Sequence, residues 1–183
     1  RIARPRIVIC IPSGVTDVEQ RSVSESAEHA NASEVYLIEE TMAAALGAEM
    51  SSVTESRGGM VVDIGGGTTG ILVISLGGLV LSKSIKVAGD SMNNAIIDYV
   101  RRTYNVLIGE NMAETVKKDI ADVREPPAEI KEMQIRGRSL ENGLPRSLDV
   151  TTVDITKALD ESVDEIIDVI KETLDLTPPE LSG

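Results

Sequence analysis

Residues 60–74 read MVVDIGGGTTGILVI, and this stretch decides the fold. It contains two apolar runs rich in β-branched residues, which are typical of buried strands. Asp63 ends the first run, and three glycines and two threonines separate it from the second. Because the chain returns at once as a strand, the stretch predicts a β-hairpin with a tight, glycine-rich loop.

The composition of this loop suits a phosphate group. Glycine amides can approach a ligand closely, and several of them in a tight turn form a concave site for phosphate oxygens. Thr68 and Thr69 add hydroxyl donors, and Asp63 is placed to hold a hydrated magnesium ion. The loop is neither a P-loop nor a dinucleotide fingerprint, because no Gly-Lys-Ser/Thr follows and the next element is a strand. A plain glycine hairpin with a solvated aspartate fits the same residues.

The bulk composition narrows the class of protein. The 183 residues are 42% hydrophobic and 26% charged, which predicts a soluble chain of one domain or two small lobes. A net charge of -12 disfavours binding to nucleic acid. The only cysteine, Cys10, is predicted to be a small buried hydrophobe, and the only histidine, His29, a surface residue. One cysteine and one histidine are too few for a zinc site, and they do not suggest Cys–His catalysis.

Strands and helices alternate along the chain. Strands are predicted at residues 6–11, 34–38, 59–64, 70–76, 79–87, 129–139 and 145–151, with a two-residue turn at Gly77-Gly78. Helices are predicted at residues 17–30, 39–50, 89–104 and 110–121, and from Thr151 to Pro178. Capping-box spacing begins the first helix at Thr16 and the last at Thr151. The last helix carries an apolar stripe of Ile155, Leu159, Val163, Ile166, Ile170 and Leu174. These elements predict an α/β protein with a mixed sheet.

Longer segments carry a resemblance. YLIEETMAAALGA at 36–48 precedes the hairpin, and co-linear similarity continues through residues 8–21, 74–110, 136–150 and 170–182. On these segments the chain resembles the MreB family, the bacterial actins that direct rod shape. Hsp70 ATPases share the hairpin and an acidic, alanine-rich helix, but not the later segments.

The resemblance implies an actin/Hsp70-like ATPase fold, with a mixed sheet flanked by helices and a small α+β lobe, incomplete at both ends. It implies four parts. Residues 1–50 correspond to the end of the first large subdomain with the hinge helix, and residues 51–104 to the second large subdomain. Residues 105–150 correspond to the small lobe, and residues 151–183 to a helix returning to the second large subdomain.

The resemblance also assigns roles to residues. The phosphate loop corresponds to Gly65, Gly66, Gly67, Thr68 and Thr69, and Asp63 to the aspartate near the metal. Glu40 corresponds to the carboxylate that positions the attacking water, with Thr68 assisting. On residue type alone, Glu39 and Glu40 are two acidic residues that stabilise the first turn of a helix. We assign only this stabilising role to Glu39 and the functional role to Glu40.

The small lobe supplies a second set of implied contacts. Glu114, Thr115, Val116 and Lys117 correspond to residues that touch ribose and adenine, and Gly89-Asp90 to a turn lining the cleft. On residue type alone, Glu114 and Lys117 are an i,i+3 surface pair. The chain departs from the family pattern at two positions: Thr41 stands where proline is usual, and Gly70 where glutamate is usual.

The function implied is that of a cell-shape-determining cytoskeletal ATPase that binds ATP and Mg²⁺ and polymerises into filaments guiding cell-wall synthesis. Its expected partners are further copies of itself, membrane proteins of cell-wall elongation such as MreC and RodZ, and the inner membrane surface through regions outside this chain. We expect a cytoplasmic protein on the inner face of the membrane, with ATPase activity in the full-length protein and little in this piece alone. Two alternatives stay open: a non-catalytic actin-like module that binds partners, and an Hsp70-type ATPase.

Overall fold

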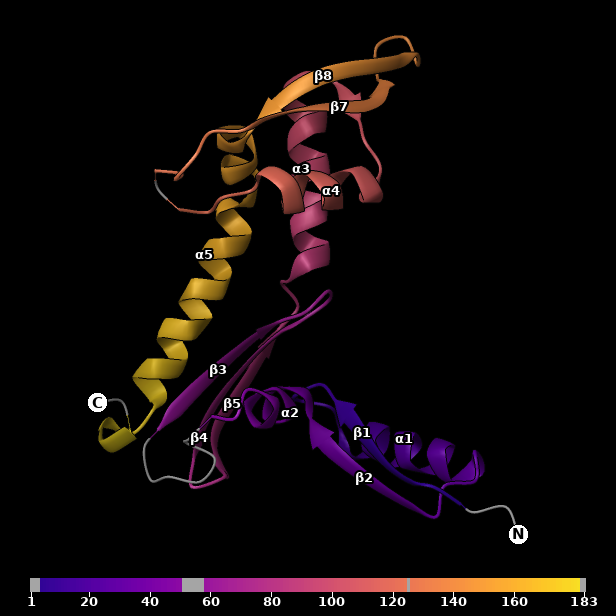
Figure 1. Cartoon of the computed structure of the whole chain (residues 1–183), viewed down its shortest axis with the longest axis vertical. Helices are drawn as coiled ribbons and strands as arrows, with labels where there is room; N and C mark the ends of the chain where they lie inside the picture. Colours follow the sequence, from indigo (N-terminus) through magenta and orange to yellow (C-terminus); the bar gives the residue numbers. More distant parts are fainter. Residues whose placement is uncertain (1–3, 51–57, 125, 182–183) are drawn as a thin grey trace. The chain divides into compact units, whose positions relative to one another are not determined.

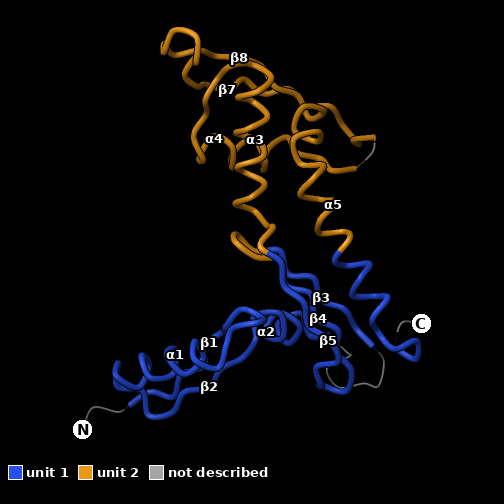
Figure 2. Tube along the Cα trace, turned by 180° about the vertical axis from the view of Figure 1, so that it is seen from behind, with its two compact units in different colours: residues 1–64, 69–85, 169–183 blue, residues 65–68, 86–168 orange. Residues whose placement is uncertain are grey.

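The computed structural model describes residues 4–50, 58–124 and 126–181. The chain forms two compact units (Figure 2). Unit 1 comprises residues 1–64, 69–85 and 169–183, and unit 2 comprises residues 65–68 and 86–168. The division into four parts at residues 50, 104 and 150 is not tested by these units and stays a prediction.

Unit 1 begins with two parallel strands joined by a helix (Figure 1). These are β1 (Arg6–Ile11), α1 (Asp17–His29) and β2 (Glu34–Glu39), and the strands pair along their whole length. The predicted capping box is confirmed: the Glu19 amide donates to Thr16 Oγ1 at 3.3 Å, and the Thr16 amide donates to Glu19 Oε2 at 2.8 Å. These bonds satisfy two amides that the start of a helix otherwise leaves without a partner.

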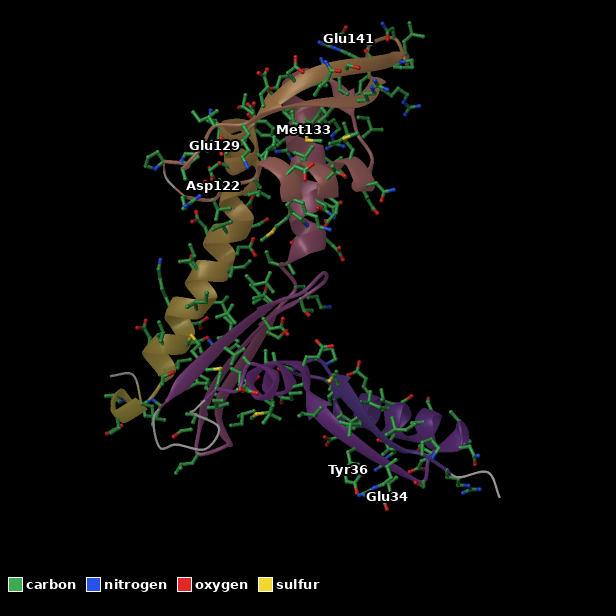
Figure 3. The ribbon with its side chains drawn as sticks, in the orientation of Figure 1. Glu34, Tyr36, Asp122, Glu129, Met133 and Glu141 are labelled. Carbon is green, nitrogen blue, oxygen red and sulfur yellow. The ribbon has the colours of Figure 1, made fainter. Side chains whose placement is uncertain are left out.

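One face of this strand pair is exposed. Along β1 the burial alternates, so that Val8 is 67% exposed and Ile11 only 7%. Cys10 shares the exposed face, and the prediction that it is buried is therefore wrong. A continuous apolar run suggests a strand covered on both sides, but in the described structure β1 alternates as a strand covered on one side does. On the exposed face of β2, the Tyr36 hydroxyl donates to Glu34 Oε2 at 2.6 Å (Figure 3).

The second sheet of unit 1 consists of the two predicted hairpins. Its strands are β3 (Gly59–Ile64), β4 (Thr69–Ser75) and β5 (Gly78–Ile85), all antiparallel. Helix α2 (Glu40–Gly47) contacts β3 and β4, where Ala45, Leu72 and Ile74 form a buried cluster. The helix ends at Gly47 rather than Met50, because Glu49 adopts a left-handed conformation with φ of 53°.

The turn between β4 and β5 consists of Leu76 and Gly77, one residue earlier than predicted. Both have positive φ, 49° and 68°. Two left-handed residues in a two-residue loop form the type I′ turn, whose twist matches that of the strands. Gly78 is the first residue of β5 and pairs with Ser75. The glycine pair therefore located the hairpin but not its register.

Unit 2 packs helices against a small antiparallel sheet. Its elements are α3 (Gly89–Tyr104), β6 (Val106–Leu107), α4 (Glu110–Ile120), β7 (Glu132–Ser139), β8 (Pro145–Thr151) and the first part of α5 (Thr152–Leu176). The short strand β6, which the sequence did not predict, extends the sheet in the order β6-β7-β8. The core of this unit is aliphatic and includes Ile96, Val100, Val116, Ile135, Val150 and Ile155, each fully buried.

Helix α5 contributes to both units. It begins at the second predicted capping box, where Thr151 and Asp154 exchange backbone-to-side-chain hydrogen bonds of 2.9 and 3.4 Å. The predicted apolar stripe is correct as far as Ile166 but wrong at Leu174, which is 46% exposed, whereas Thr173 is fully buried. The helical repeat of 3.6 residues brings Thr173 rather than Leu174 onto the buried side after Ile170. The chain leaves the helix before Pro178, as predicted, and a short 3₁₀ turn, η2 (Pro179–Leu181), follows.

Candidate nucleotide site

The glycine loop between β3 and β4 belongs to unit 2 and is held by backbone hydrogen bonds. The Gly65 amide donates to the Thr68 carbonyl at 3.0 Å, which closes the loop. The loop also accepts from the first turn of α3: the Gly89 amide donates to the Gly65 carbonyl at 3.0 Å, and the Asp90 amide to the Gly66 carbonyl at 2.8 Å. The carbonyls of the loop thus face α3.

The amides of Gly66 and Gly67 have no hydrogen-bond acceptor within the part of the chain that the structure describes, and both residues are exposed. Exposed amides on a fixed, glycine-rich backbone are the donors that an anion needs. The loop therefore fits a phosphate group. This geometry suits the predicted role of Gly66 and Gly67, whereas the Gly65 amide is already bonded to the Thr68 carbonyl. The contacts of Gly65 and Thr68 with a nucleotide stay predictions.

The start of α3 lies directly beside the loop. Gly89 and Asp90 are the first residues of this helix, which begins where its periodicity predicts, and their place in the lining of a cleft stays a prediction. A Cβ at Gly89 would lie 3.2 Å from the Gly65 carbonyl oxygen, so the close approach favours glycine. A Cβ at Gly66 would lie 3.6 Å from Asp90 Oδ2. A carboxylate so close to the loop opposes a bare phosphate but is compatible with a phosphate that carries a cation.

Helix α4 is tied to the same corner of unit 2. Lys117 Nζ donates to the Gly89 carbonyl and pairs with Glu114 Oε2, each at 2.8 Å. Lys118 Nζ pairs with the other carboxylate oxygen of Glu114 at 2.9 Å. The hydrogen bonds from Lys117, Lys118 and Asn93 lower the pKa of Glu114 to about 2. The structure therefore brings Glu114 and Lys117 to the glycine loop through Gly89.

The two residues between them are placed differently. Thr115 is exposed, and its hydroxyl donates to the Asn111 carbonyl at 2.8 Å. Val116 is fully buried in the aliphatic core of unit 2. Their predicted contacts with ribose or adenine are not tested and stay predictions, and the buried side chain of Val116 has an evident role in packing.

Sequence reasoning missed Asn93. Its side chain is 9% exposed, and Nδ2 donates to Glu114 Oε2 at 2.8 Å. This bond assigns the amide orientation, because the oxygen of the amide would repel the carboxylate. Among the described residues, Asn93 Oδ1 is a buried polar atom without a hydrogen-bond partner. The sequence contains one indication of a role for Asn93: it lies four residues after Gly89, so the two residues are on the same face of helix α3.

The remaining predicted residues belong to unit 1. Glu40 is the exposed first residue of α2, and Thr69 is fully buried at the start of β4. Asp63 on β3 pairs with Gly70 on β4. Because paired residues point to the same face of an antiparallel sheet, Asp63 lies on the face that Gly70 turns toward α2. Glu40, Asp63 and Thr69 are assigned to unit 1, and Asp63 and Thr69 belong to the two strands that the loop connects.

Gly70 lies against Thr41, the residue after Glu40. A Cβ at Gly70 would lie 2.7 Å from Thr41 Cγ2, and the Thr41 side chain is only 2% exposed. The two departures from the family pattern are therefore in contact. The methyl group of Thr41 occupies the space that any side chain at position 70 would need.

The described residues contain no group of three or more His, Cys, Asp or Glu side chains that could hold a metal ion by themselves. A magnesium ion bound through Asp63 would need water or phosphate oxygens as its other ligands, as this ion commonly does.

In the described part of the chain, no helix combines the length and apolar character needed to cross a membrane.

Comparison with known proteins extends these findings. A family model described as MreB/Mbl protein matches residues 1–183. The cell shape-determining protein MreB of Escherichia coli strain K12 is 48% identical over 179 residues, which cover 98% of this chain and 51% of the relative. The cell shape-determining protein Mbl of Bacillus subtilis strain 168 is 47% identical over 181 residues, covering 99% of this chain and 54% of the relative.

A solved structure agrees with the sequence relatives. The crystal structure of MreB5 of Spiroplasma citri bound to AMPPNP superposes with a TM-score of 0.91 at 39% identity, covering 96% of this chain and 52% of that one. The chain thus spans about half the length of the relatives it matches. It belongs to the MreB/Mbl family of cell shape-determining, actin-like proteins and has their α/β fold.

Proposed function

We propose that the intact protein containing this chain binds ATP with Mg²⁺ and hydrolyses it. The observation that carries the proposal is the corner of unit 2 where the exposed amides of Gly66 and Gly67 lie beside the α3 N-terminus. Lys117 bonds to the Gly89 carbonyl at this corner and pairs with Glu114. The AMPPNP bound to the Spiroplasma citri relative supports an adenine nucleotide as the ligand.

In this proposal each residue has a distinct task. The amides of Gly66 and Gly67 bind phosphate oxygens, and Glu114 and Lys117 bind the nucleoside. Asp63 would hold magnesium through water, and the bound ion would supply positive charge beside the phosphates. Glu40, with Thr68, orients the attacking water. Phosphoryl transfer to water depends mainly on such positioning and charge neutralisation.

We further propose that the intact protein assembles with copies of itself into filaments that guide cell-wall synthesis on the cytoplasmic face of the membrane. Family membership supports this role. Membrane proteins of cell-wall elongation such as MreC and RodZ are the expected partners, and the contact with the membrane is assigned to regions outside this chain. Membership of the MreB/Mbl family leaves no role for the Hsp70-type alternative.

The test measures nucleotide affinity, phosphate release and sedimentation of polymer with Mg-ATP, all on the intact protein. The Glu40→Gln variant should keep its affinity and lose about 100-fold or more in turnover, because an uncharged amide orients the attacking water less well than a carboxylate. Glu25→Gln, which changes an exposed glutamate on α1, is the matched control and should behave as wild type. An intact wild-type protein that neither binds ATP nor sediments contradicts the proposal.

A non-catalytic actin-like module is the second candidate, and the contact between Thr41 and Gly70 favours it. This contact leaves no carboxylate and no space for one beside Asp63 on β4. Such a module would bind ATP and polymerise, but phosphate would be released no faster than from ATP in buffer without protein. Comparison with a Gly70→Glu variant that also carries Thr41→Ser, which removes the blocking methyl group, tests whether a carboxylate at position 70 creates turnover.

A further inference from the structure

Four polar side chains form a hydrogen-bonded group around the N-terminus of α2 in unit 1. They come from four places in the sequence: Ser13 from the segment after β1, Glu39 from the end of β2, Thr41 from α2 and Ser82 from β5. Ser13 Oγ lies 3.2 Å from Glu39 Oε2 and 3.3 Å from Thr41 Oγ1. Ser82 Oγ lies 3.4 Å from Glu39 Oε2.

The chemistry of these groups sets the direction of each bond. An ionised carboxylate only accepts, so Ser13 and Ser82 both donate to Glu39. The single proton of Ser13 is then used, and Thr41 must donate to Ser13. The result is a chain of hydrogen bonds from Thr41 through Ser13 to Glu39. Ser13 is therefore the group that joins the residues on the two sides of Glu40.

Both branches of Thr41 are held. Its hydroxyl bonds to Ser13, and its methyl group lies against Gly70. A β-branched side chain has few χ1 rotamers, so fixing both branches fixes the side chain. Because Glu39 and Thr41 are anchored, the backbone of Glu40 between them is anchored too, while the Glu40 side chain stays exposed.

The Glu39 side chain does not cap helix α2. It occupies the N-cap position of α2 with an extended backbone, yet its side chain makes no capping hydrogen bond. Its carboxylate instead accepts from Ser13 and Ser82. The acidic pair Glu39-Glu40 is therefore divided into one residue that anchors and one that projects into solvent.

We propose that Ser13 is a positioning residue for Glu40, acting through its hydrogen bonds to Glu39 and Thr41. The inference rests on the proposed function, in which Glu40 orients the attacking water. Removing the Ser13 hydroxyl frees the start of α2 and lets the Glu40 carboxylate occupy orientations that do not hold the water.

The experiment measures steady-state ATP hydrolysis by the intact protein and its Ser13→Ala and Thr41→Val variants. Valine keeps the methyl group that packs on Gly70 and removes only the hydroxyl. We expect each variant to lower kcat about three- to tenfold with KM unchanged. Ser13→Ala loses the bonds to Glu39 and Thr41, and Thr41→Val loses the bond to Ser13. The double variant should be no worse than Ser13→Ala alone, because Ser13→Ala already removes the bond that Thr41→Val removes. Ser13→Thr restores the hydroxyl and should recover most of kcat.

Two controls separate positioning from stability. Ser33→Ala removes a hydroxyl that donates to the Pro5 carbonyl at 3.1 Å, away from α2, and should leave kcat unchanged. In a Glu40→Gln background, Ser13→Ala should have no further effect on turnover. Circular dichroism and nucleotide affinity identify any variant that is unfolded, and Thr41→Val then carries the test.

The outcomes are distinct. A wild-type kcat in folded Ser13→Ala and Thr41→Val, a rise in KM alone, or an effect of Ser13→Ala that persists without Glu40 overturns the inference and leaves the proposed function intact. An intact wild-type protein with no ATP turnover overturns the hydrolytic part of the proposed function, and the inference with it.

Discussion

The side chains at positions 41 and 70 exclude each other. A Cβ at Gly70 would lie 2.7 Å from Thr41 Cγ2, a separation at which an atom must move, and Thr41 is too buried to turn away. The identity of residue 41 thus sets what is allowed at residue 70. The two departures from the family pattern form one packing arrangement.

This exclusion makes a prediction about stability. Gly70→Ala should lower the free energy of unfolding by about 1–3 kcal/mol, because it overpacks a contact that has no free space. Adding Thr41→Ser removes the methyl group and should recover most of that loss. Urea denaturation measures both variants. Gly47→Ala, where no atom lies within 4 Å of the new Cβ, is the control and should not lower stability. A Gly70→Ala protein as stable as wild type would contradict the packing argument.

The lowered pKa of Glu114 predicts that the stability of the fold depends on pH. Hydrogen bonds from Lys117, Lys118 and Asn93 lower its pKa from 4.5 to about 2. A carboxylate with a lower pKa in the folded state stabilises the fold above the unfolded value, and this stabilisation is lost as the pH falls through the folded value. Wild-type Tm should therefore decrease between pH 4.5 and 2, and Glu114→Gln should decrease less. Thermal unfolding at stepped pH measures the difference.

A coupled variant provides the control for this pH effect. Lys117 is the largest cause of the lowered pKa of Glu114. Adding Lys117→Met to Glu114→Gln should therefore change the pH dependence of Tm no further. An additional change in slope would show that other groups produce the effect.

Among the elements, the hairpin of β4 and β5 has one unfavourable turn residue. Leu76 has φ of 49° and is 67% exposed, so its backbone is strained while its side chain gains nothing from burial. Leu76→Asn creates the Asn-Gly pair that type I′ turns prefer, and should raise the free energy of unfolding by about 0.5–1 kcal/mol. Urea denaturation tests the value. Leu144→Asn, at a position 62% exposed, removes similar apolar surface and should give no gain. Destabilisation by Leu76→Asn would contradict the assigned turn.

In the whole molecule, the two units differ in the size of their apolar clusters. Among the described residues, the cluster of unit 2 contains eleven buried side chains, whereas the cluster formed by α2 and the hairpin sheet of unit 1 contains three. Buried apolar contacts determine how often a region opens to solvent. Unit 2 should therefore be the more stable part of the chain.

Hydrogen exchange followed by mass spectrometry tests this difference on the 183-residue chain. Peptides from α3, β7 and β8 should exchange at least about tenfold more slowly than peptides from β1 and β2, since opening free energies follow local packing. The outer face of β1 is exposed, which adds to the contrast. Equal protection of the two regions would show that both units unfold together.

Much of the local structure follows from the order of residues alone. The strands around the glycine loop, the capping boxes at Thr16 and Thr151, and the helix from Gly89 to Tyr104 lie where the sequence predicts them. These features depend on periodicity and on hydrogen bonds between residues three or four apart, which the sequence displays directly. Family membership is also carried by the sequence, because similarity extends over the entire chain.

The rest was decided by contacts between residues far apart in the chain. The exposure of Cys10 depends on which face of β1 other elements cover, and the contact of Thr41 with Gly70 joins a helix to a strand. Asn93 bonds to Glu114 across two helices, and Ser13 connects the residues that flank Glu40. No local pattern encodes such partners, because packing of distant elements determines which side chains meet. For that reason the sequence located the glycine loop, while only the tertiary structure showed what holds it and what anchors Glu40.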